Sequence, residues 1–200
     1  GATSDGSRGV FGMGHTGTAY SNVLEYITID FPGNALDYGD STQARKTIQP
    51  DAISNGSRGI FGGGYAPGSS DVIDYITIGS LSNGIDFGNL VAANYGLAGT
   101  SNGSRGVFAG GYPPAGSNVV DMEYVQISTP GNAIDFGDAT DGRQAHSAIS
   151  DGSRGIFGGG LDGATRFDTI DYITIDTPGN AADFGELSQE RGQIAAISGD

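Results

Sequence analysis

The stretch Asp-Gly-Ser-Arg-Gly-Ile-Phe-Gly-Gly-Gly at residues 151–160 has the glycine spacing of a loop that could hold phosphate groups. It lacks the Lys-Ser/Thr pair that a phosphate-binding loop requires, and no helix pattern follows it. Closely similar stretches occur at 5–14, 55–64 and 102–111. A catalytic loop is needed once, whereas a structural unit that shares its core with its neighbours is needed several times. The motif therefore predicts a repeat architecture rather than nucleotide chemistry.

Other groups that could do chemistry are few. The chain has no cysteine and two histidines, His15 in an expected loop and His146 in an expected strand, with no metal-ligand spacing between them. The 23 acidic residues recur with the repeats, so no carboxylate pair is singled out for glycoside hydrolysis. We therefore predict no catalytic site, no metal site and no cofactor.

The composition limits the partners. A formal net charge of −14 should repel nucleic acid and anionic membrane surfaces, and no apolar run has the length of a membrane span. We expect neither nucleic acid nor membrane as a partner, while an oligomer is compatible with the sequence without being required. The location is left open, and an extracellular or virion location would suit the acidic surface.

Arginines mark the repeat at positions 8, 58, 105 and 154, with separations of 50, 47 and 49 residues. Four segments rich in β-branched, aromatic and glycine residues recur in each unit, and an Asp/Asn-Gly turn opens each one. We predict a single all-β domain over residues 1–200, built from four repeats of about 49 residues, each a four-stranded antiparallel meander. The middle strands are expected at 22–29, 71–78, 121–127 and 168–175.

The order of the segments resembles kelch repeats: an apolar strand and turn (HSAISDG), a di-glycine strand (RGIFGGG), a third strand (VIDYITI), and an aromatic residue in the fourth. The first repeat departs from the di-glycine with Gly12-Met13-Gly14, and the usual kelch tryptophan is absent. Aromatic residues in its place are Tyr38, Phe87, Phe136 and Phe184. The stretches YITI and GNAIDFG also resemble repeats in predicted structural and tail proteins of cyanobacterial tailed phages. The kelch resemblance implies a β-propeller of four-stranded blades.

Kelch order also implies where such a ring is sealed. The first repeat starts at its second strand, and residues 191–198 supply a spare inner strand. We therefore predict a four-bladed propeller in which this C-terminal strand pairs beside residues 8–14 and closes the ring. Two alternatives are that two chains supply eight blades, or that the 200 residues belong to a longer array.

Charged residues also have repeat positions. Counting the strands outward from their turns places each turn arginine in one row with an aspartate of the fourth strand, where a charge-assisted pair would fix the register. The predicted structural pairs are Arg8–Asp37, Arg58–Asp86, Arg105–Asp135 and Arg154–Asp183. A ring of four arginines that binds an anion is the alternative. A second set of acids lies in the most apolar strand and needs hydrogen bonds, from neighbouring backbone or around a cation: Glu25, Asp74, Glu123 and Asp171.

The loops between the second and third strands differ among the repeats while the strands hold steady, which is typical of a rigid scaffold that presents binding loops. We expect all four loops on one face. The candidate ligand-binding residues are Tyr20, Tyr65, Tyr112, Arg166 and Phe167. The sequence thus predicts a non-enzymatic binding or structural module of a phage or other extracellular appendage, with a surface glycan or protein as ligand. The alternatives are a glycan-processing enzyme and a purely architectural protein.

Overall fold

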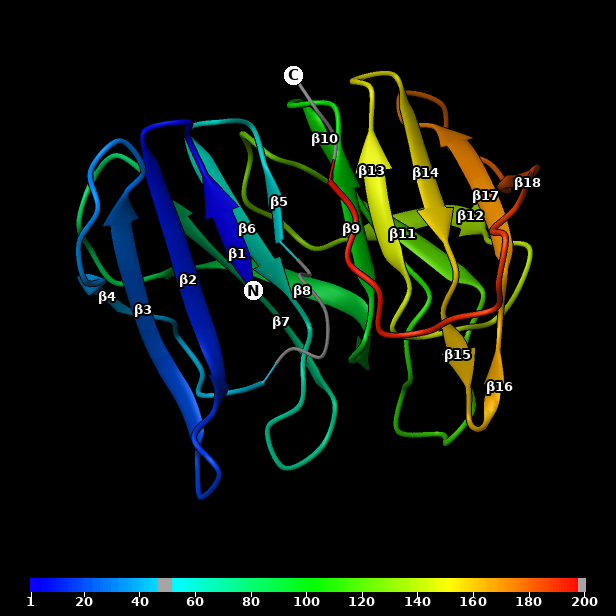
Figure 1. Cartoon of the computed structure of the whole chain (residues 1–200), viewed down its shortest axis with the longest axis horizontal. Helices are drawn as coiled ribbons and strands as arrows, with labels where there is room; N and C mark the ends of the chain where they lie inside the picture. Colours follow the sequence, from blue (N-terminus) through cyan, green and yellow to red (C-terminus); the bar gives the residue numbers. More distant parts are fainter. Residues whose placement is uncertain (47–51, 198–200) are drawn as a thin grey trace.

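The computed structural model describes residues 1–46 and 52–197, and its regular structure is entirely β (Figure 1). Four antiparallel sheets of four strands follow one another along the chain, and we number them I to IV. The described residues contain no helix that could cross a membrane. The all-β class and the four-stranded antiparallel meanders are therefore confirmed.

Sheet I contains β1 (Ala2–Ser4), β2 (Arg8–His15), β3 (Tyr20–Thr28) and β4 (Leu36–Asp40), and sheet II contains β5 (Ala52–Ser54), β6 (Arg58–Gly62), β7 (Ser70–Thr77) and β8 (Ile85–Asn94). Sheet III contains β9 (Ala98–Ser101), β10 (Arg105–Ala109), β11 (Asp121–Gln126) and β12 (Ile134–Asp138). Sheet IV contains β13 (Ser147–Ser150), β14 (Arg154–Gly158), β17 (Thr169–Thr174) and β18 (Ala182–Glu186). A hairpin of β15 (Leu161–Asp162) and β16 (Thr165–Arg166) extends from sheet IV.

A tight turn joins the first two strands of each sheet. In sheet I the carboxylate of Asp5 accepts hydrogen bonds from the backbone N–H groups of Ser7 (2.9 Å) and Arg8 (2.7 Å), while Gly6 has a φ of 88°. Such a left-handed conformation favours glycine, and the Asx side chain holds the turn. The same pair of bonds is made by Asn55, Asn102 and Asp151. The Asp/Asn-Gly pair therefore makes the inner strand of each repeat return as a hairpin.

The sheets pack face to face through the same six positions at every junction. Three side chains of one sheet contact three of the next, and none is more than 3% exposed. The sets are Val10, Leu24 and Tyr38 with Phe61, Ile76 and Ile78; Ile60, Ile73 and Phe87 with Phe108, Val125 and Ile127; and Val107, Met122 and Phe136 with Phe157, Ile173 and Ile175. Burying each such side chain stabilises the fold by roughly 1.5–3 kcal/mol, so the core lies between sheets rather than within one.

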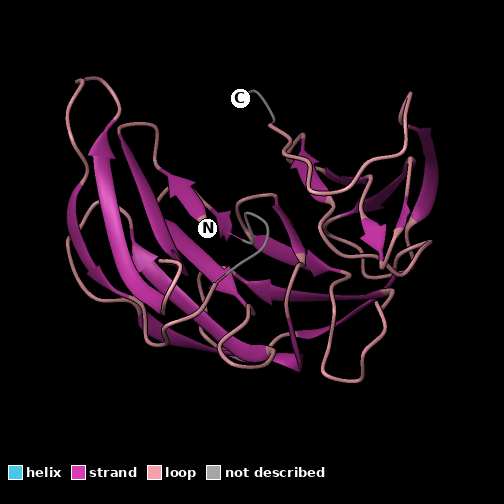
Figure 2. Cartoon of the chain, turned by 60° about the horizontal axis from the view of Figure 1, so that its bottom comes forward, coloured by secondary structure: helices cyan, strands magenta, loops and turns pink. Residues whose placement is uncertain are grey.

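The four sheets form an arc. The inner strands β1, β5, β9 and β13 contact one another in chain order, and the other strands extend outward from them (Figures 1 and 2). Sheets I and IV stand at the two ends of the arc, and no hydrogen bond joins them within residues 1–46 and 52–197. Each end sheet therefore packs against another sheet on one face only.

The predicted closure by the C-terminal strand is wrong. Residues 191–197 form no strand, and residue 198 lies outside the described residues. The edge of β2 is instead occupied by β1, with Thr3 opposite Val10. The physical reason is local: residues 2–4 read Ala-Thr-Ser, close to the Ala-Ile-Ser of the other inner strands, and a short turn brings them to β2 without the entropic cost of closing a long loop. The first repeat therefore supplies its own inner strand.

The predicted arginine–aspartate pairs are wrong as well. Arg58 lies opposite Thr77 of β7, whereas Asp86 lies opposite Asp74, three residues before Thr77 in the same strand. A β-bulge between Ile73 and Asp74 and a long turn after β7 shift the fourth strand away from the arginine. The ion pairs of the described residues do not include Arg8–Asp37, Arg58–Asp86, Arg105–Asp135 or Arg154–Asp183.

The turn arginines connect neighbouring sheets instead. The guanidinium of Arg58 lies 4.3 Å from the ring centre of Tyr75, and its Nη1 donates to the carbonyl oxygen of Ile127 in sheet III (2.7 Å). The same bond joins Arg8 to Ile78 (2.8 Å) and Arg105 to Ile175 (2.9 Å). These arginines hold adjacent sheets together through a cation–π contact and a charge-assisted hydrogen bond.

Candidate binding surface

The loops between the second and third strands share one edge of the molecule, the lower edge in Figure 1. Three of them connect β2 to β3, β6 to β7 and β10 to β11, and the fourth carries the β15–β16 hairpin. Because the loops join equivalent strands of successive sheets, they emerge in the same direction. The expectation that the variable loops lie on one face is confirmed.

Five aromatic rings form a continuous row along this edge. Neighbouring ring centres are 5.1 Å apart for His15 and Tyr20, 5.9 Å for Tyr20 and Tyr65, 5.4 Å for Tyr65 and Tyr95, and 5.5 Å for Tyr95 and Tyr112. The rings meet in edge-to-face and tilted geometries, which are the favoured arrangements of aromatic pairs. We call these five residues the aromatic row; it spans sheets I, II and III.

Backbone pairing between connecting segments and loops fixes the row. The N–H of Tyr112 donates to the carbonyl oxygen of Tyr95 (2.8 Å), and the N–H of Tyr65 donates to that of Lys46 (2.8 Å). Each pair joins the segment that leaves one sheet to the loop of the next sheet. The Lys46 ammonium lies 5.3 Å from the centre of the Tyr65 ring, a cation–π distance. The rings are therefore held by backbone bonds as well as by contacts with one another.

Tyr95 lies within the row, and its phenol is kept neutral by its surroundings. Burial raises the pKa of Tyr95 above its ordinary value, and the neighbouring Tyr112 and Tyr65 act in the same direction. The tyrosines of the row are half-buried, so their ring surfaces and hydroxyl groups stay partly accessible. The Tyr112 hydroxyl donates to the carbonyl oxygen of Gly116 in its own loop (2.9 Å). The row offers apolar ring surface beside hydroxyl groups without a formal negative charge.

Three of the five predicted binding residues, Tyr20, Tyr65 and Tyr112, belong to the row. The other two, Arg166 and Phe167, lie at the hairpin of sheet IV and make no ring contact with the row in the described part of the chain. The exposed Arg166 donates a hydrogen bond within its own loop, to the carbonyl oxygen of Ala164 (3.3 Å). The row ends before sheet IV because Leu161 occupies the position of Tyr65 and Tyr112 there.

The sequence analysis did not assign His15 and Tyr95 to the binding face. A signal for Tyr95 was available: Lys46, Tyr95 and Gln144 occupy one repeat position in the segments between sheets, and each forms a bridge to the loop of the next sheet. Only the comparison of connecting segments would have shown that this position borders the loops.

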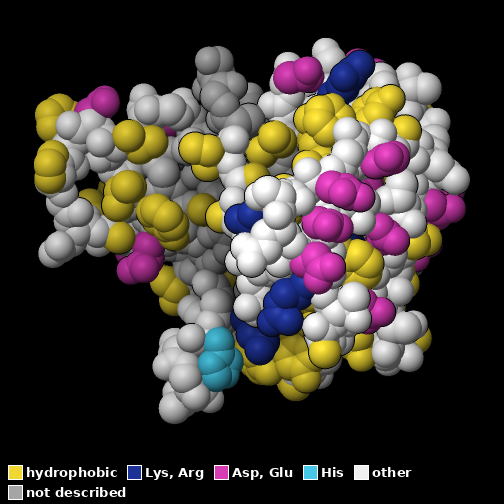
Figure 3. All heavy atoms as spheres, turned by 45° about the vertical axis from the view of Figure 1, so that its right-hand side comes forward, with side chains coloured by type: hydrophobic (Ala, Val, Ile, Leu, Met, Phe, Trp, Pro, Cys, Tyr) yellow, Lys and Arg dark blue, Asp and Glu magenta, His cyan; other side chains and the backbone are white. Residues whose placement is uncertain are grey.

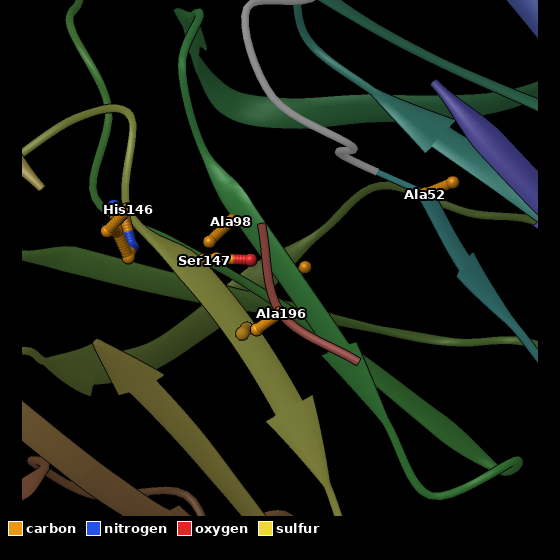
Figure 4. A pocket seen from close by; sticks show the side chains of 7 residues that line it. Ala52, Ala98, His146, Ser147 and Ala196 are labelled. Carbon is orange, nitrogen blue, oxygen red and sulfur yellow. The ribbon is translucent and has the colours of Figure 1, made fainter. Parts of the chain in front are cut away.

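The inner strands enclose a small cavity of about 140 Å³ (Figure 4). Its lining is formed by Ala52, Ala98, Gly99, His146, Ser147, Ala148 and Ala196. His146 is 2% exposed, its ring centre lies 6.0 Å from that of Phe157, and its Nδ1 has no hydrogen-bond partner in the described residues. Burial, together with the charge of Arg143, lowers the pKa of His146 to about 3. His146 is therefore a neutral histidine that borders the cavity.

The buried acids are hydrogen-bonded, and two of them are also paired with arginines that the sequence analysis left unpaired. Arg45 Nη1 lies 2.6 Å from Asp74, and Arg143 Nη2 lies 2.5 Å from Asp171. Asp171 also accepts a backbone hydrogen bond from Thr140 (3.0 Å) of the preceding sheet's connecting segment. The expected bond to neighbouring backbone is confirmed there, and the ion pairs were missed.

Glu123 occupies the same repeat position without an arginine. It is 6% exposed, and its Oε2 accepts a hydrogen bond from the backbone N–H of Val91 in sheet II (2.6 Å). Burial raises the pKa of Glu123 to about 7, against the lowering effect of that bond. Among the described residues, no group of three or more His, Cys, Asp or Glu side chains could hold a metal ion.

No protein-family model matches the chain, and no curated protein matches it.

Proposed function

We propose that the chain is a non-enzymatic binding module built of β-propeller blades, and that its aromatic row binds an extended surface glycan. The continuity of the row from His15 to Tyr112, across three sheets, is the observation that carries this proposal. A narrow, unbroken line of rings suits a chain-like ligand better than a flat protein surface. A surface glycan as ligand would place the module outside a cell or on a virion.

The chemistry of the row supports a neutral sugar polymer. Tyrosines supply rigid ring surface that packs against apolar sugar faces, and their hydroxyl groups, with small polar neighbours, supply adaptable hydrogen bonds. The net charge of −14 disfavours a polyanionic ligand. The sheets beneath hold the rings in place before binding, so less conformational entropy of the side chains is lost when a ligand binds.

A glycan array with neutral and acidic members tests the proposal. The wild-type protein is compared with the Tyr65→Ala/Tyr95→Ala double variant, with thermal melting as the check of folding. We expect binding of a neutral glycan and a loss of tenfold or more in the double variant, since truncating a central aromatic residue costs roughly 2 kcal/mol or more. Leu81→Ala is the control, because Leu81 is 54% exposed and lies between β7 and β8, outside the row.

Equal binding by the double variant would refute the proposal. A wild-type protein that binds no glycan would favour the architectural alternative. Release of reducing sugar ends from a bound glycan would instead support a glycan-processing enzyme.

A further inference from the structure

The two ends of the arc each present one half of a sheet junction. At one end Phe11 of sheet I is 50% exposed, whereas its equivalents Phe61, Phe108 and Phe157 are at most 1% exposed. At the other end Phe184 of sheet IV is 51% exposed, whereas its equivalents Tyr38, Phe87 and Phe136 are at most 3% exposed. The unmatched set on sheet I is Phe11, Ile27 and Ile29, and that on sheet IV is Ile156, Ile170 and Phe184. By repeat position, these two sets are the complementary halves of one junction.

The exposed apolar surface is large at sheet I. Val23 (46%), Ile29 (48%) and Phe31 (72%) are exposed on or next to β3, beside Phe11 of β2. Figure 3 shows hydrophobic side chains gathered over the lobe of sheet I and acidic side chains over the lobe of sheet IV. A contiguous apolar patch of this kind marks an interaction site.

The hydrogen bonds that join neighbouring sheets have their donor at one end of the arc and their acceptor at the other. The guanidiniums of Arg8, Arg58 and Arg105 donate to a carbonyl oxygen of the next sheet. The fourth arginine, Arg154, has only the ring of Tyr172 beside it, at 5.1 Å, and makes no hydrogen bond through its guanidinium in the described residues. The matching acceptor is the carbonyl oxygen of Ile29, the sheet I equivalent of Ile78 and Ile127.

A charge pair is divided in the same way. Arg45 and Arg143 reach forward to Asp74 and Asp171 of the next sheet. The third such arginine, Arg191, follows sheet IV, and its carbonyl oxygen accepts the hydrogen bond of Gly160 (2.9 Å), just as that of Arg143 accepts the bond of Gly111 (2.9 Å). Its exposed side chain contacts only Gln189 in the described residues, while the equivalent acid Glu25 is exposed on sheet I. The two ends thus carry opposite charges at matching positions.

The outer edges match as well. At the junction of sheets II and III, Gly131 and Ala133 donate their N–H groups to Phe87 (2.7 Å) and Asn89 (2.8 Å). The side chain of Asn132 accepts a hydrogen bond from the N–H of Asn89 (3.1 Å). The donors in sheet I are Gly33 and Ala35, with Asn34 between them, and the equivalents of Phe87 and Asn89 in sheet IV are Phe184 and Glu186. None of these bonds is made at the ends of the described chain.

We propose that sheet IV of one chain docks on sheet I of a second copy of the same chain and forms a fourth junction of the same kind. The occupant is a second copy because the missing half of each contact, apolar, cationic and hydrogen-bonding, is supplied by the other end of this chain. In Figure 1, sheets II and III lie behind sheets I and IV, so the faces of sheets I and IV that no other sheet covers look to the same side, where the C-terminal segment crosses sheet IV. Two copies facing each other can therefore make both contacts at once and close a symmetric ring of eight sheets.

The C-terminal segment limits how the copies meet. Residues Ile194, Ala195 and Ala196 line an apolar groove of about 310 Å³ on sheet IV, together with Ile156 and Ile170. In a docked pair this groove receives sheet I of the partner copy, which already carries its own β1. The segment must then leave the groove, so a variant that ends at Gln193 associates at least as tightly as the full chain.

Sedimentation over a range of protein concentrations tests the proposal. We expect a reversible species of twice the mass of one chain, equally or more populated in the variant that ends at Gln193. A protein that stays monomeric up to millimolar concentration, or an association that disappears when the segment is removed, would overturn the proposal.

Charge exchange tests the register of the contact. Glu25→Arg and Arg191→Glu should each weaken the association by about tenfold or more, because each places like charges together, and the double variant should regain it. Asp121→Arg is the control with the same charge change as Glu25→Arg on an exposed residue of sheet III, and should leave association unchanged. Weakening that the double variant does not relieve would refute the pairing.

Cross-linking tests the outer edge. The chain has no cysteine, so the double variant Asn34→Cys/Glu186→Cys should form a covalent dimer on oxidation. The matched pair Asn89→Cys/Asn132→Cys lies on an internal junction and should close within one chain, without change of mass. Absence of the covalent dimer while the internal pair closes would contradict the proposed contact.

Discussion

Sheets III and IV carry a buried carboxylate at the same repeat position, in opposite electrostatic surroundings. Asp171 of sheet IV lies 2.5 Å from Arg143, whereas the carboxyl of Glu123 in sheet III accepts a hydrogen bond from the backbone N–H of Val91 and forms no ion pair among the described residues. The position of Arg143 is taken by Asn94 before sheet III: their carbonyl oxygens accept equivalent hydrogen bonds from Gly111 and Gly64, both of 2.9 Å. The same backbone thus holds an ion pair in one place and a carboxyl with a raised pKa in the other.

This difference shows that the fold needs an acceptor at this position but does not need a charge there. A buried ion pair stabilises little compared with a neutral, well-packed group, yet removing one partner leaves an uncompensated charge that is costly. Sheet III avoids that cost by letting its carboxyl take up a proton, which the pKa of about 7 permits.

Removing Arg143 should have the largest effect. Arg143→Met leaves Asp171 buried with Thr140 as its remaining partner, so we expect the free energy of unfolding at pH 8 to fall by about 3–5 kcal/mol. Chemical denaturation measures this loss. The double variant Arg143→Met/Asp171→Asn should recover most of it, and a loss of the same size in both variants would show that packing, rather than the charge, is responsible.

Glu123 should make stability depend on pH. Its pKa in the folded protein, about 7, lies above the ordinary value of 4.5, so the unfolded chain releases this proton first and the free energy of unfolding falls as pH rises between these values. This difference between the pKa values of the folded and unfolded protein corresponds to about 3 kcal/mol in the free energy of unfolding. Glu123→Gln keeps the acceptor for Val91 and removes the ionisation, so it should be more stable than the wild type by up to that amount at pH 8 and equal to it at pH 4.

Melting curves of both proteins across this pH range measure the effect. Asp171→Asn is the variant for comparison, because the carboxylate of Asp171 in the wild-type protein is paired with Arg143, whereas Glu123 has no arginine beside it. A Glu123→Gln difference that does not change with pH would mean that the pKa of this carboxyl is the same in the folded and the unfolded protein.

The sequence predicted what depends on repetition. The Asx-Gly turns, the four-stranded antiparallel meanders and the common face of the loops all follow from residue types that recur at fixed spacing. Three of the tyrosines on the loop face, Tyr20, Tyr65 and Tyr112, were also identified because the loops vary while the strands do not.

What depends on register could not be predicted. A β-bulge beside each buried acid, such as that between Met122 and Glu123, places the fourth strand where counting from the turns does not. Arginines and acids were both recognised as repeat-equivalent, but the turn arginines were paired with acids instead of backbone carbonyl oxygens of the next sheet, and the connecting arginine Arg143 was left without Asp171. The position of residues 191–197 depended on whether β1 could occupy the edge of β2, a competition between two nearly identical segments that sequence spacing cannot decide.

Supplying the missing arginine should make sheet III resemble sheet IV. Asn94→Arg places a guanidinium at the position from which Arg45 and Arg143 reach their acids, so we expect the pKa of Glu123 to fall by at least one unit, towards its ordinary value. The change also removes the hydrogen bond from Asn94 to Gly110 (2.8 Å). The net gain in stability at pH 8 should therefore be only about 1 kcal/mol. Carboxyl NMR titration measures the pKa, and a value that stays near 7 would show that the arginine does not reach the acid.

The last comparison concerns the threonines that support the paired acids, and its Thr140 variant has the smallest expected effect. The hydroxyl of Thr42 donates to Asp74, whereas Thr140 reaches Asp171 through its backbone N–H. Thr42→Val should therefore cost about 1–2 kcal/mol, because it removes a hydrogen bond to a buried carboxylate. Thr140→Val leaves the backbone donor in place and should change the free energy of unfolding by less than about 0.5 kcal/mol. Equal losses in the two variants would mean that the methyl contacts of both threonines, rather than the hydroxyl donor, set their contribution to stability.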